Sequence, residues 1–321
     1  MVTEKSAEGF TLYEIQKDDE NLINPVLSST GVVSNFTCFP QLYAYLTKSS
    51  NHLYIVNFRE KPRIILHRNS DLNDIRIMFS KEEKDEEFIE KIKKQFSPKY
   101  IAYNLIPEKP SAVEPNKMAI RDELILDVST VRALDDPRVK KDYNRCKKRH
   151  PNIQYRRATP KDKKQIVDFV DRWCQRETEK RGALVTGENV KRYIELFLSE
   201  DGINIDVIID QDKVIGITSH SSHPLEQKLA VSTFSMVDRG YKQLGVFAYV
   251  EQAKAIDAQG FTKALIGGRE SLIVGGKENT SKADFKMRFM KNGSINTYYS
   301  QEVLSADNFV VGPNYLRDFW A

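Results

Sequence analysis

Two glycines, Gly240 and Gly245, stand where a strand predicted over Ala230–Val237 gives way to a helix predicted over Val246–Gln259. The first turn of a helix carries unpaired backbone N–H groups and the positive end of the helix dipole. Glycine allows a bulky anion to approach the backbone closely. This stretch therefore indicates a site for a pyrophosphate or a carboxylate, although an ordinary strand-to-helix turn has the same spacing.

Basic residues are concentrated in one segment of the chain. Residues 132 to 164 hold 13 Lys and Arg against 4 Asp and Glu, a local charge of 13 − 4 = +9, in a chain whose total is 49 − 45 = +4. The rest of the chain then sums to 4 − 9 = −5. Such a concentration favours an anionic donor, acceptor or partner, for example tRNA or another nucleic acid, or a nucleotide. A solvated helix face is the alternative explanation.

Several function classes are disfavoured by motifs that the sequence lacks. The three cysteines (Cys38, Cys146 and Cys174) lie far apart with no CxxC pair, which argues against a disulfide scaffold and a zinc site. The sequence has no Gly-x-Ser-x-Gly, no P-loop and no strand-linked Gly-x-Gly-x-x-Gly. His220 and His223 have no third ligand nearby, so we predict no metal site.

No apolar run reaches the roughly 18 residues of a membrane span, and none of signal-peptide length follows the first residues. Together with the sparse cysteines, these features make a reducing cytoplasm the expected location.

Length and element order indicate two domains of the α/β (α+β) class. At about 150 residues per domain, 321 residues correspond to roughly two. Prolines mark a break at 107–117, and we predict domains at 1–126 and 127–321. The second half is predicted as β-α-α-β-β-β-α-β, then a helix over 281–291 and a strand, and the first half has a similar order of elements. In the second half, the first helix of this order is capped at Thr159. We predict that it buries Ile166, Phe169, Val170 and Trp173.

The glycine loop, the hairpin before it and the strand after it resemble the core of the GNAT superfamily of N-acetyltransferases. That family binds acyl-CoA through an Arg/Gln-x-x-Gly-x-Gly/Ala loop, which aligns with residues 242–247. Gly245 matches the central glycine, and Phe247 stands in place of a small residue. Phe289 stands where many members have a tyrosine that protonates the leaving group. We expect Phe247 to crowd the pyrophosphate position, which disfavours a tightly held acetyl-CoA.

Two further stretches resemble one subgroup of that superfamily. Gly275-Gly276-Lys277-Glu278 and the segment from Asp284 to Phe289 are similar to Gly-Gly-x-Glu and Phe-Lys-x-x-Phe patterns of the Fem-type aminoacyltransferases and of the C-terminal domain of phosphatidylglycerol lysyltransferase. Those proteins also carry a basic helix, here around 142–149, entering their second fold. The resemblance implies two tandem GNAT-like domains, the first degenerate, with a mixed, mostly antiparallel sheet flanked by helices. It also implies a transferase that moves an acyl or aminoacyl group from acyl-CoA, such as acetyl-CoA, or from aminoacyl-tRNA, to an amine.

The predicted site surrounds the glycine loop. Eight residues are expected to hold the donor: Val237, Arg239, Lys242, Leu244, Gly245, Val246, Phe247 and Ala248. Substrate contacts are predicted for Arg269, Glu278, Thr186, His220, Arg145 and Lys148.

Three residues are expected to be catalytic, because acyl transfer passes through an oxyanion and releases a proton. Glu270 follows a strand at its carboxyl end and is the predicted base. Lys286 would stabilise the oxyanion or the donor phosphate as a point charge. Tyr298 would replace the missing phenol, with Tyr299 as the alternative because neighbouring strand residues face opposite sides. A solvated carboxylate and a surface lysine are the simpler explanations of the first two.

Two other functions stay open at this point. One is a catalytically inactive GNAT-fold module that grips RNA or DNA through residues 138–164. The other is an enzyme that acylates a base amine of a nucleic acid.

Overall fold

The computed structural model describes residues 5–7, 10–47, 51–68, 73–79, 85–106, 118–181, 185–268, 272–274, 277–279 and 281–305. The chain divides into two compact units, Met1–Asp122 with Thr297–Ala321, and Glu123–Asn296. Both boundaries fall inside strands, β7 (Met118–Asp127) and β15 (Ser294–Ser305). The predicted domains differ from these units, because the prediction placed the last strand in the second domain whereas most of β15 belongs to the first unit. The physical reason is that β15 finds its antiparallel partner in β6 of the first unit.

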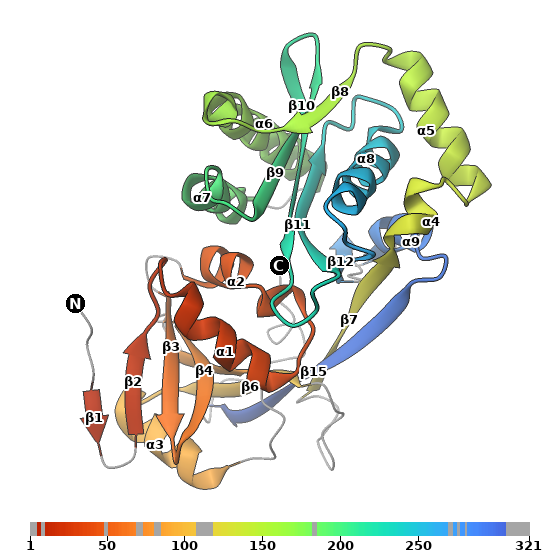
Figure 1. Ribbon diagram of the computed structural model, residues 1–321. Helices are drawn as coiled ribbons and strands as arrows, with labels where there is room; N and C mark the ends of the chain where they lie inside the picture. The colour runs from red at the N-terminus through yellow and green to blue at the C-terminus, as the bar shows by residue number, and fades with distance from the viewer. Residues whose placement is uncertain are drawn as a thin grey trace. The chain divides into compact units, whose positions relative to one another are not determined.

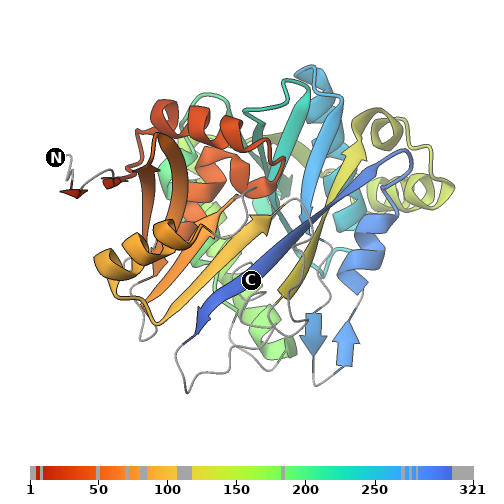
Figure 2. The same cartoon turned by 90° about the horizontal axis from the view of Figure 1, so that it is seen from below.

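The first unit is built on a sheet in the order β1-β2-β3-β4-β5-β6-β15. Neighbouring strands run antiparallel except β5 and β6, which are parallel. Figure 2 shows β15 beside β6. The strands other than β15 are β1 (Lys5–Ala7), β2 (Phe10–Glu14), β3 (Asn51–Phe58), β4 (Lys61–Arg68), β5 (Asp74–Met78) and β6 (Tyr100–Ile106).

Helices cover both faces of this first sheet: α1 (Glu20–Thr30), α2 (Phe39–Leu46) and α3 (Glu86–Phe96). Side chains of a strand alternate between faces, so Ile64 and Leu66 of β4 pack with α1 and α2 while Ile65 between them packs with α3. Phe88 and Ile92 of α3 lie four residues apart, on one side of the helix, and are buried in that second core.

In the second unit the hydrogen-bonded strands follow in the order β7-β12-β11-β10-β9-β8. All neighbours run antiparallel except β11 and β12, which are parallel. The strands other than β7 are β8 (Gln154–Arg157), β9 (Ile203–Asp210), β10 (Lys213–Ser222), β11 (Leu229–Val237) and β12 (Lys263–Gly268). Both units therefore have a mixed, mostly antiparallel sheet flanked by helices, as predicted.

Two groups of helices flank the sheet of the second unit (Figure 1). On one side lie α6 (Lys163–Arg181) and α7 (Glu188–Phe197). On the other lies α8 (Leu244–Ala258), with α4 (Val128–Arg132) and α5 (Pro137–Arg149) packed against it. The main core of this unit forms under α8, from residues such as Leu126, Ile215 and Ala253.

The strand predicted at 230–237 and the helix predicted at 246–259 are confirmed to within two residues at each end, as β11 and α8. The last helix, α9 (Ser281–Met287), ends four residues before the predicted end at 291. A hairpin of β13 (Leu272–Val274) and β14 (Lys277–Asn279) forms where no strand was predicted. Among the helices of the described residues, none combines the length and apolar character needed to cross a bilayer.

Gly293 joins α9 to β15 at a close backbone approach. A Cβ atom at this position would lie 2.6 Å from the carbonyl oxygen of Ile125 and 2.8 Å from Cε of Met290. The first of these neighbours is backbone and cannot move without disturbing β7.

We therefore expect Gly293→Ala to lower the free energy of unfolding by about 1–3 kcal/mol, measured by urea titration. Ser294→Ala, at the exposed next position, serves as the control and should change it by less than about 0.5 kcal/mol. Equal stability of the two variants would contradict the close approach.

Candidate functional site

Strands β11 and β12 part along the sheet, which leaves their facing backbone edges without pairing to each other. The two strands pair only over Leu229–Val231 and Lys263–Leu265. Beyond these residues, within the described chain, residues 232–237 and 266–268 do not pair with each other. Backbone N–H and C=O groups released in this way need other partners. An extended ligand can supply them by lying along the open edge.

The parting coincides with a bulge at Thr233. Ser219 of β10 lies opposite Phe234, whereas the next residue, His220, lies opposite Ser232, so Thr233 is an extra residue in β11. A bulge bends its strand and increases the local twist. It lies two residues after the last pair with β12, and it therefore accounts for the change in direction of β11.

Lys286 of α9 places a buried cation at this opening. Its Nζ donates a hydrogen bond to the carbonyl oxygen of Ile266 at 2.8 Å, and the residue is 6% exposed. Ile266 is the first residue of β12 beyond the pairing with β11. The ammonium group thus satisfies a carbonyl at the edge of the opening, and Lys286 is not the surface lysine of the alternative explanation.

The Phe-Lys-x-x-Phe pattern has a packing explanation. The rings of Phe285 and Phe289 lie 5.4 Å apart, and both contact the ring of Tyr249 in α8, at 5.4 and 4.9 Å. A spacing of four residues puts two aromatic side chains on one side of a helical turn. The pattern therefore holds α9 against α8 by aromatic packing and directs the intervening lysine to β12.

The first turn of α8 presents backbone amides to the loop before it. The chain enters the helix through Gln243, whose φ of 63° is left-handed, and the side chain of Gln243 makes no capping hydrogen bond. The carbonyl of Gln243 accepts from the N–H groups of Val246 and Phe247. The N–H of Gly245 has no acceptor among the described residues, and Gly245 is partly exposed. This amide fits the predicted anion site.

The aromatic ring beside this turn is Phe285, and Phe247 points elsewhere. A Cβ on Gly245 would lie 3.2 Å from Cζ of Phe285, so this ring covers one flank of the turn. Phe247 is buried, and its ring stacks on Tyr143 of α5 with centroids 5.8 Å apart. The expectation that Phe247 crowds the anion position is wrong, because its side chain packs between α8 and α5.

The side chains of Leu244, Val246 and Ala248 are also buried in the core under α8. Of these three donor-binding candidates, only the backbone can reach a ligand. Val237 ends β11 opposite Gly216 of β10, and Lys242 is exposed in the loop.

The basic helix α5 ends beside the start of α8. Nη1 of Arg149 donates to Oε1 of Gln243 at 2.5 Å, and the rings of His150 and Tyr241 lie 4.9 Å apart. Lys148 is exposed in the same last turn. The positive end of the α8 dipole therefore lies next to a cluster of cationic side chains, an arrangement that attracts an anion.

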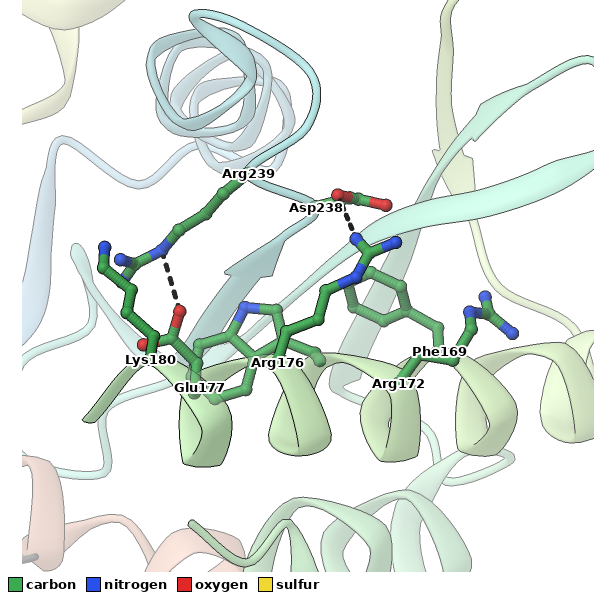
Figure 3. A pocket seen from close by; sticks show the side chains of 8 residues that line it. Phe169, Arg172, Arg176, Glu177, Lys180, Asp238 and Arg239 are labelled. Atoms are coloured by element: carbon green, nitrogen blue, oxygen red, sulfur yellow. Dashed lines mark hydrogen bonds and ion pairs between the residues drawn. The ribbon is translucent and has the colours of Figure 1, made fainter. Parts of the chain in front are cut away.

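A pocket of about 170 Å³ lies on the other side of the same loop, against α6 (Figure 3). Arg176 pairs with Asp238 at 2.5 Å, and Nε of Arg239 pairs with Glu177 at 3.1 Å. The lining residues are Phe169, Arg172, Trp173, Arg176, Glu177, Lys180, Asp238 and Arg239.

Only Arg239 of this pocket was predicted as a site residue. Trp173 was predicted as a core residue because it continues the apolar stripe of α6. It is only partly buried and lines the pocket. The four-residue spacing of Arg172, Arg176 and Lys180 was the available signal, since it puts three cations on one helix face.

The predicted substrate contacts are dispersed. Arg145 is exposed on α5, and Thr186 is exposed just before α7. Arg269 and Glu270 lie outside the described residues, as does the side chain of Glu278, so these three remain predictions from sequence. No group of three metal-ligating side chains capable of holding an ion occurs within the described ranges.

Tyr298 packs in the core of the first unit. It belongs to the first unit, is 4% exposed in that unit's core, and its hydroxyl donates to the carbonyl of Val33. A phenol held in this way is engaged in structure, so its placement gives no support to the predicted acid role.

His220 is enclosed in β10 and is 0% exposed. Its Nε2 lies 2.9 Å from Nε2 of Gln259, and its Nδ1 lies 3.5 Å from Oδ2 of Asp206. Burial, with Arg157 nearby, lowers the pKa of His220 to about 4. Burial also raises the pKa of Asp206 to about 6, against the opposing effect of a hydrogen bond from Tyr155. His220 is therefore a neutral structural residue at pH 7, which does not favour the predicted substrate contact.

The two shifts predict opposite effects on stability between pH 4 and 6. Because the pKa of Asp206 is raised in the folded state, Asp206 contributes to the free energy of unfolding at low pH, and this contribution is lost as the pH rises through about 6. Because the pKa of His220 is lowered, His220 contributes at higher pH, and its contribution is lost as the pH falls toward about 4. Relative to wild type, the unfolding free energy of Asp206→Asn should therefore rise by about 2 kcal/mol from pH 4 to 6, and that of His220→Gln should fall by about as much. Urea titrations at the two pH values measure both. Differences of the same sign would contradict a neutral pair.

Comparison with known proteins was made at the level of sequence and of structure. No family model and no curated protein matches the chain. Solved structures match almost all of it. A conserved protein of unknown function from Bacteroides thetaiotaomicron has a TM-score of 0.67 at 13% identity, covering 94% of this chain and 99% of that one.

L-PGS from Bacillus licheniformis has a TM-score of 0.58 at 11% identity, covering 89% of this chain and 91% of its own. FemX has a TM-score of 0.58 at 7% identity, covering 96% and 99%. A tandem GNAT protein from the clavulanic acid biosynthesis pathway has a TM-score of 0.51 at 10% identity, covering 93% and 100%. The chain therefore has a tandem GNAT-like fold, as the sequence motifs predicted. At these identities the likeness concerns the fold alone.

Proposed function

We propose that the second unit is an aminoacyltransferase that moves an aminoacyl group from tRNA to an amine. The observation that carries this proposal is the convergence of positive groups on the turn between β11 and α8. The amide of Gly245 and the basic end of α5 at Arg149 lie at this turn. Phe285 contacts Gly245 while its neighbour Lys286 contacts β12, so α9 links the turn to the opening between the strands.

The form of the basic surface favours a polymeric anion as the donor. Helix α5 buries one stripe, Val139, Tyr143 and Cys146, and exposes cations over the rest of its length. A nucleic acid can contact many of these cations at once, whereas the few phosphates of CoA reach only some of them. Phe285 beside Gly245 also narrows the place where the backbone of GNAT enzymes approaches a pyrophosphate. Both features support tRNA over CoA.

The chemistry assigned to the site is an ester-to-amide exchange. The amine nitrogen attacks the carbonyl carbon of the aminoacyl ester, the bond to the ribose oxygen breaks, and the amine's proton ends on the released hydroxyl. The tetrahedral intermediate carries an oxyanion, and the ammonium of Lys286 at the opening between β11 and β12 is the group assigned to stabilise it. Glu270 keeps its predicted role as the base.

Replacing the cation at position 286 tests this assignment. The donors are tRNA carrying radiolabelled amino acids and, in parallel, labelled acetyl-CoA, each with a mixture of small amines. Label that survives alkaline hydrolysis has moved from an ester or thioester to an amide. We expect transfer from tRNA with the wild type and about 100-fold or greater loss in Lys286→Met, because a single oxyanion donor contributes at this scale. Lys286→Arg, which keeps the charge, should retain more activity.

Urea unfolding of each variant separates loss of chemistry from loss of fold. Transfer from acetyl-CoA alone would show that the donor is wrong. Binding of tRNA without any transfer would favour the inactive nucleic-acid-binding module.

The exposed cations of α5 predict that the affinity for tRNA falls as the salt concentration rises. Replacing Arg145 and Lys148 together by glutamine should weaken tRNA binding and reduce the slope of log K against log salt by about 2, roughly one for each phosphate that is no longer neutralised. Filter binding between 50 and 200 mM salt measures this slope. The matched control is the pair Lys213→Gln and Lys228→Gln, exposed in β10 and in the turn before β11, outside the basic segment of residues 132–164. A control pair with the same effect would locate the grip elsewhere.

A further inference from the structure

The pocket against α6 combines excess positive charge with an aromatic wall. Four cations line it, Arg172, Arg176, Lys180 and Arg239, against two carboxylates, which leaves a formal charge of 4 − 2 = +2. Figure 3 shows the side chains of α6 rising toward Asp238 and Arg239 of the loop. All of these residues belong to the second unit.

The two carboxylates are structural parts of the pocket. Glu177 is 3% exposed and Asp238 is 9% exposed. Each fixes one guanidinium group, Arg239 and Arg176 respectively, and Asp238 also accepts from the N–H of Gly240 at 2.9 Å. The two paired guanidinium groups are thereby held in place with N–H donors still exposed, since an arginine has five and its side chain remains more than half exposed here.

The other two cations lack such partners. Neither Arg172 nor Lys180 has an acidic partner within the part of the chain that the structure describes. With Arg176 they stand four residues apart along one face of α6, where like charges destabilise a helix by about 0.2–0.5 kcal/mol per pair. A bound anion would remove this repulsion and would complete the charge balance of the pocket.

We propose that this pocket binds a phosphate monoester, with the phosphate among Arg172, Arg176, Lys180 and Arg239 and the organic part against Trp173. A phosphate monoester carries about two negative charges at neutral pH, which matches the excess of +2. Guanidinium groups bind phosphate oxygens in pairs of hydrogen bonds. The volume of about 170 Å³ is below the roughly 300–1,000 Å³ of sites that enclose whole ligands, so the pocket holds the anionic head and part of the remainder. Binding here requires no transfer chemistry and holds whether or not the chain is a transferase.

Trp173 makes the pocket directly observable. The chain has two tryptophans, Trp173 and Trp320, so a Trp320→Phe background leaves the pocket residue as the sole indole. Inorganic phosphate, glycerol 3-phosphate and adenosine monophosphate are titrated separately at constant ionic strength, with uncharged adenosine as the comparison. We expect a saturable change in Trp173 fluorescence with the phosphates and none with adenosine. The tightest of the three probes shows whether the organic part is a nucleoside, a small polar headgroup or absent.

The matched variants remove equal charge inside and outside the pocket. Arg172→Gln with Lys180→Gln should raise the dissociation constant at least tenfold, and these substitutions break no ion pair of the described residues. Lys163→Gln with Lys164→Gln, on the same helix but outside the pocket, should change it less than twofold. Equal weakening by both pairs, adenosine binding as tightly as its monophosphate, or no saturable signal with any phosphate would overturn the proposal. Circular dichroism confirms that each variant is folded.

Discussion

The parting of β11 from β12 is the constraint on which the second unit depends. Parallel strands in a sheet interior satisfy their backbone groups through each other, and every group released by a separation needs another partner. Here the bulge at Thr233 turns β11 away, and Lys286 takes over the carbonyl of Ile266. On the β12 side of the opening, one backbone carbonyl therefore already has a hydrogen-bond donor.

A buried ammonium group is costly unless polar or charged partners surround it. Lys286 is nonetheless placed at the opening by aromatic packing of Phe285 and Phe289 against Tyr249. The neighbouring α8 contributes a further positive end at Gly245. Two positive features on adjacent elements favour a negative group near them, as the proposed transfer requires. An acyl-transfer oxyanion or a donor phosphate has this charge.

The fold was largely predictable because local patterns and tertiary packing agree. The helix after Thr159 and the strand-to-helix turn before α8 were both predicted from local patterns, and the structure contains both. The pairing of β15 with β6 was not predictable, since nothing in a strand's own residues names a partner nearly 200 positions earlier. The place of Tyr298 in the core of the first unit was unpredictable for the same reason. Phe247 was misjudged because its direction depends on Tyr143, which lies on a different helix.

The loop of residues 238–243 receives cations from two helices that flank the sheet on different sides. Its beginning meets α6, where Asp238 holds Arg176, and its end meets α5, where Gln243 holds Arg149. In both contacts a loop side chain accepts from an arginine, so the loop itself orients the cations around it. Sequence reasoning found the α5 side because its charges are contiguous, and it missed the α6 side because those charges are spaced by four and interleaved with acids. Arg172, Arg176 and Lys180 form a charged face only when the segment is helical, and Trp173 lines the same pocket as its apolar wall.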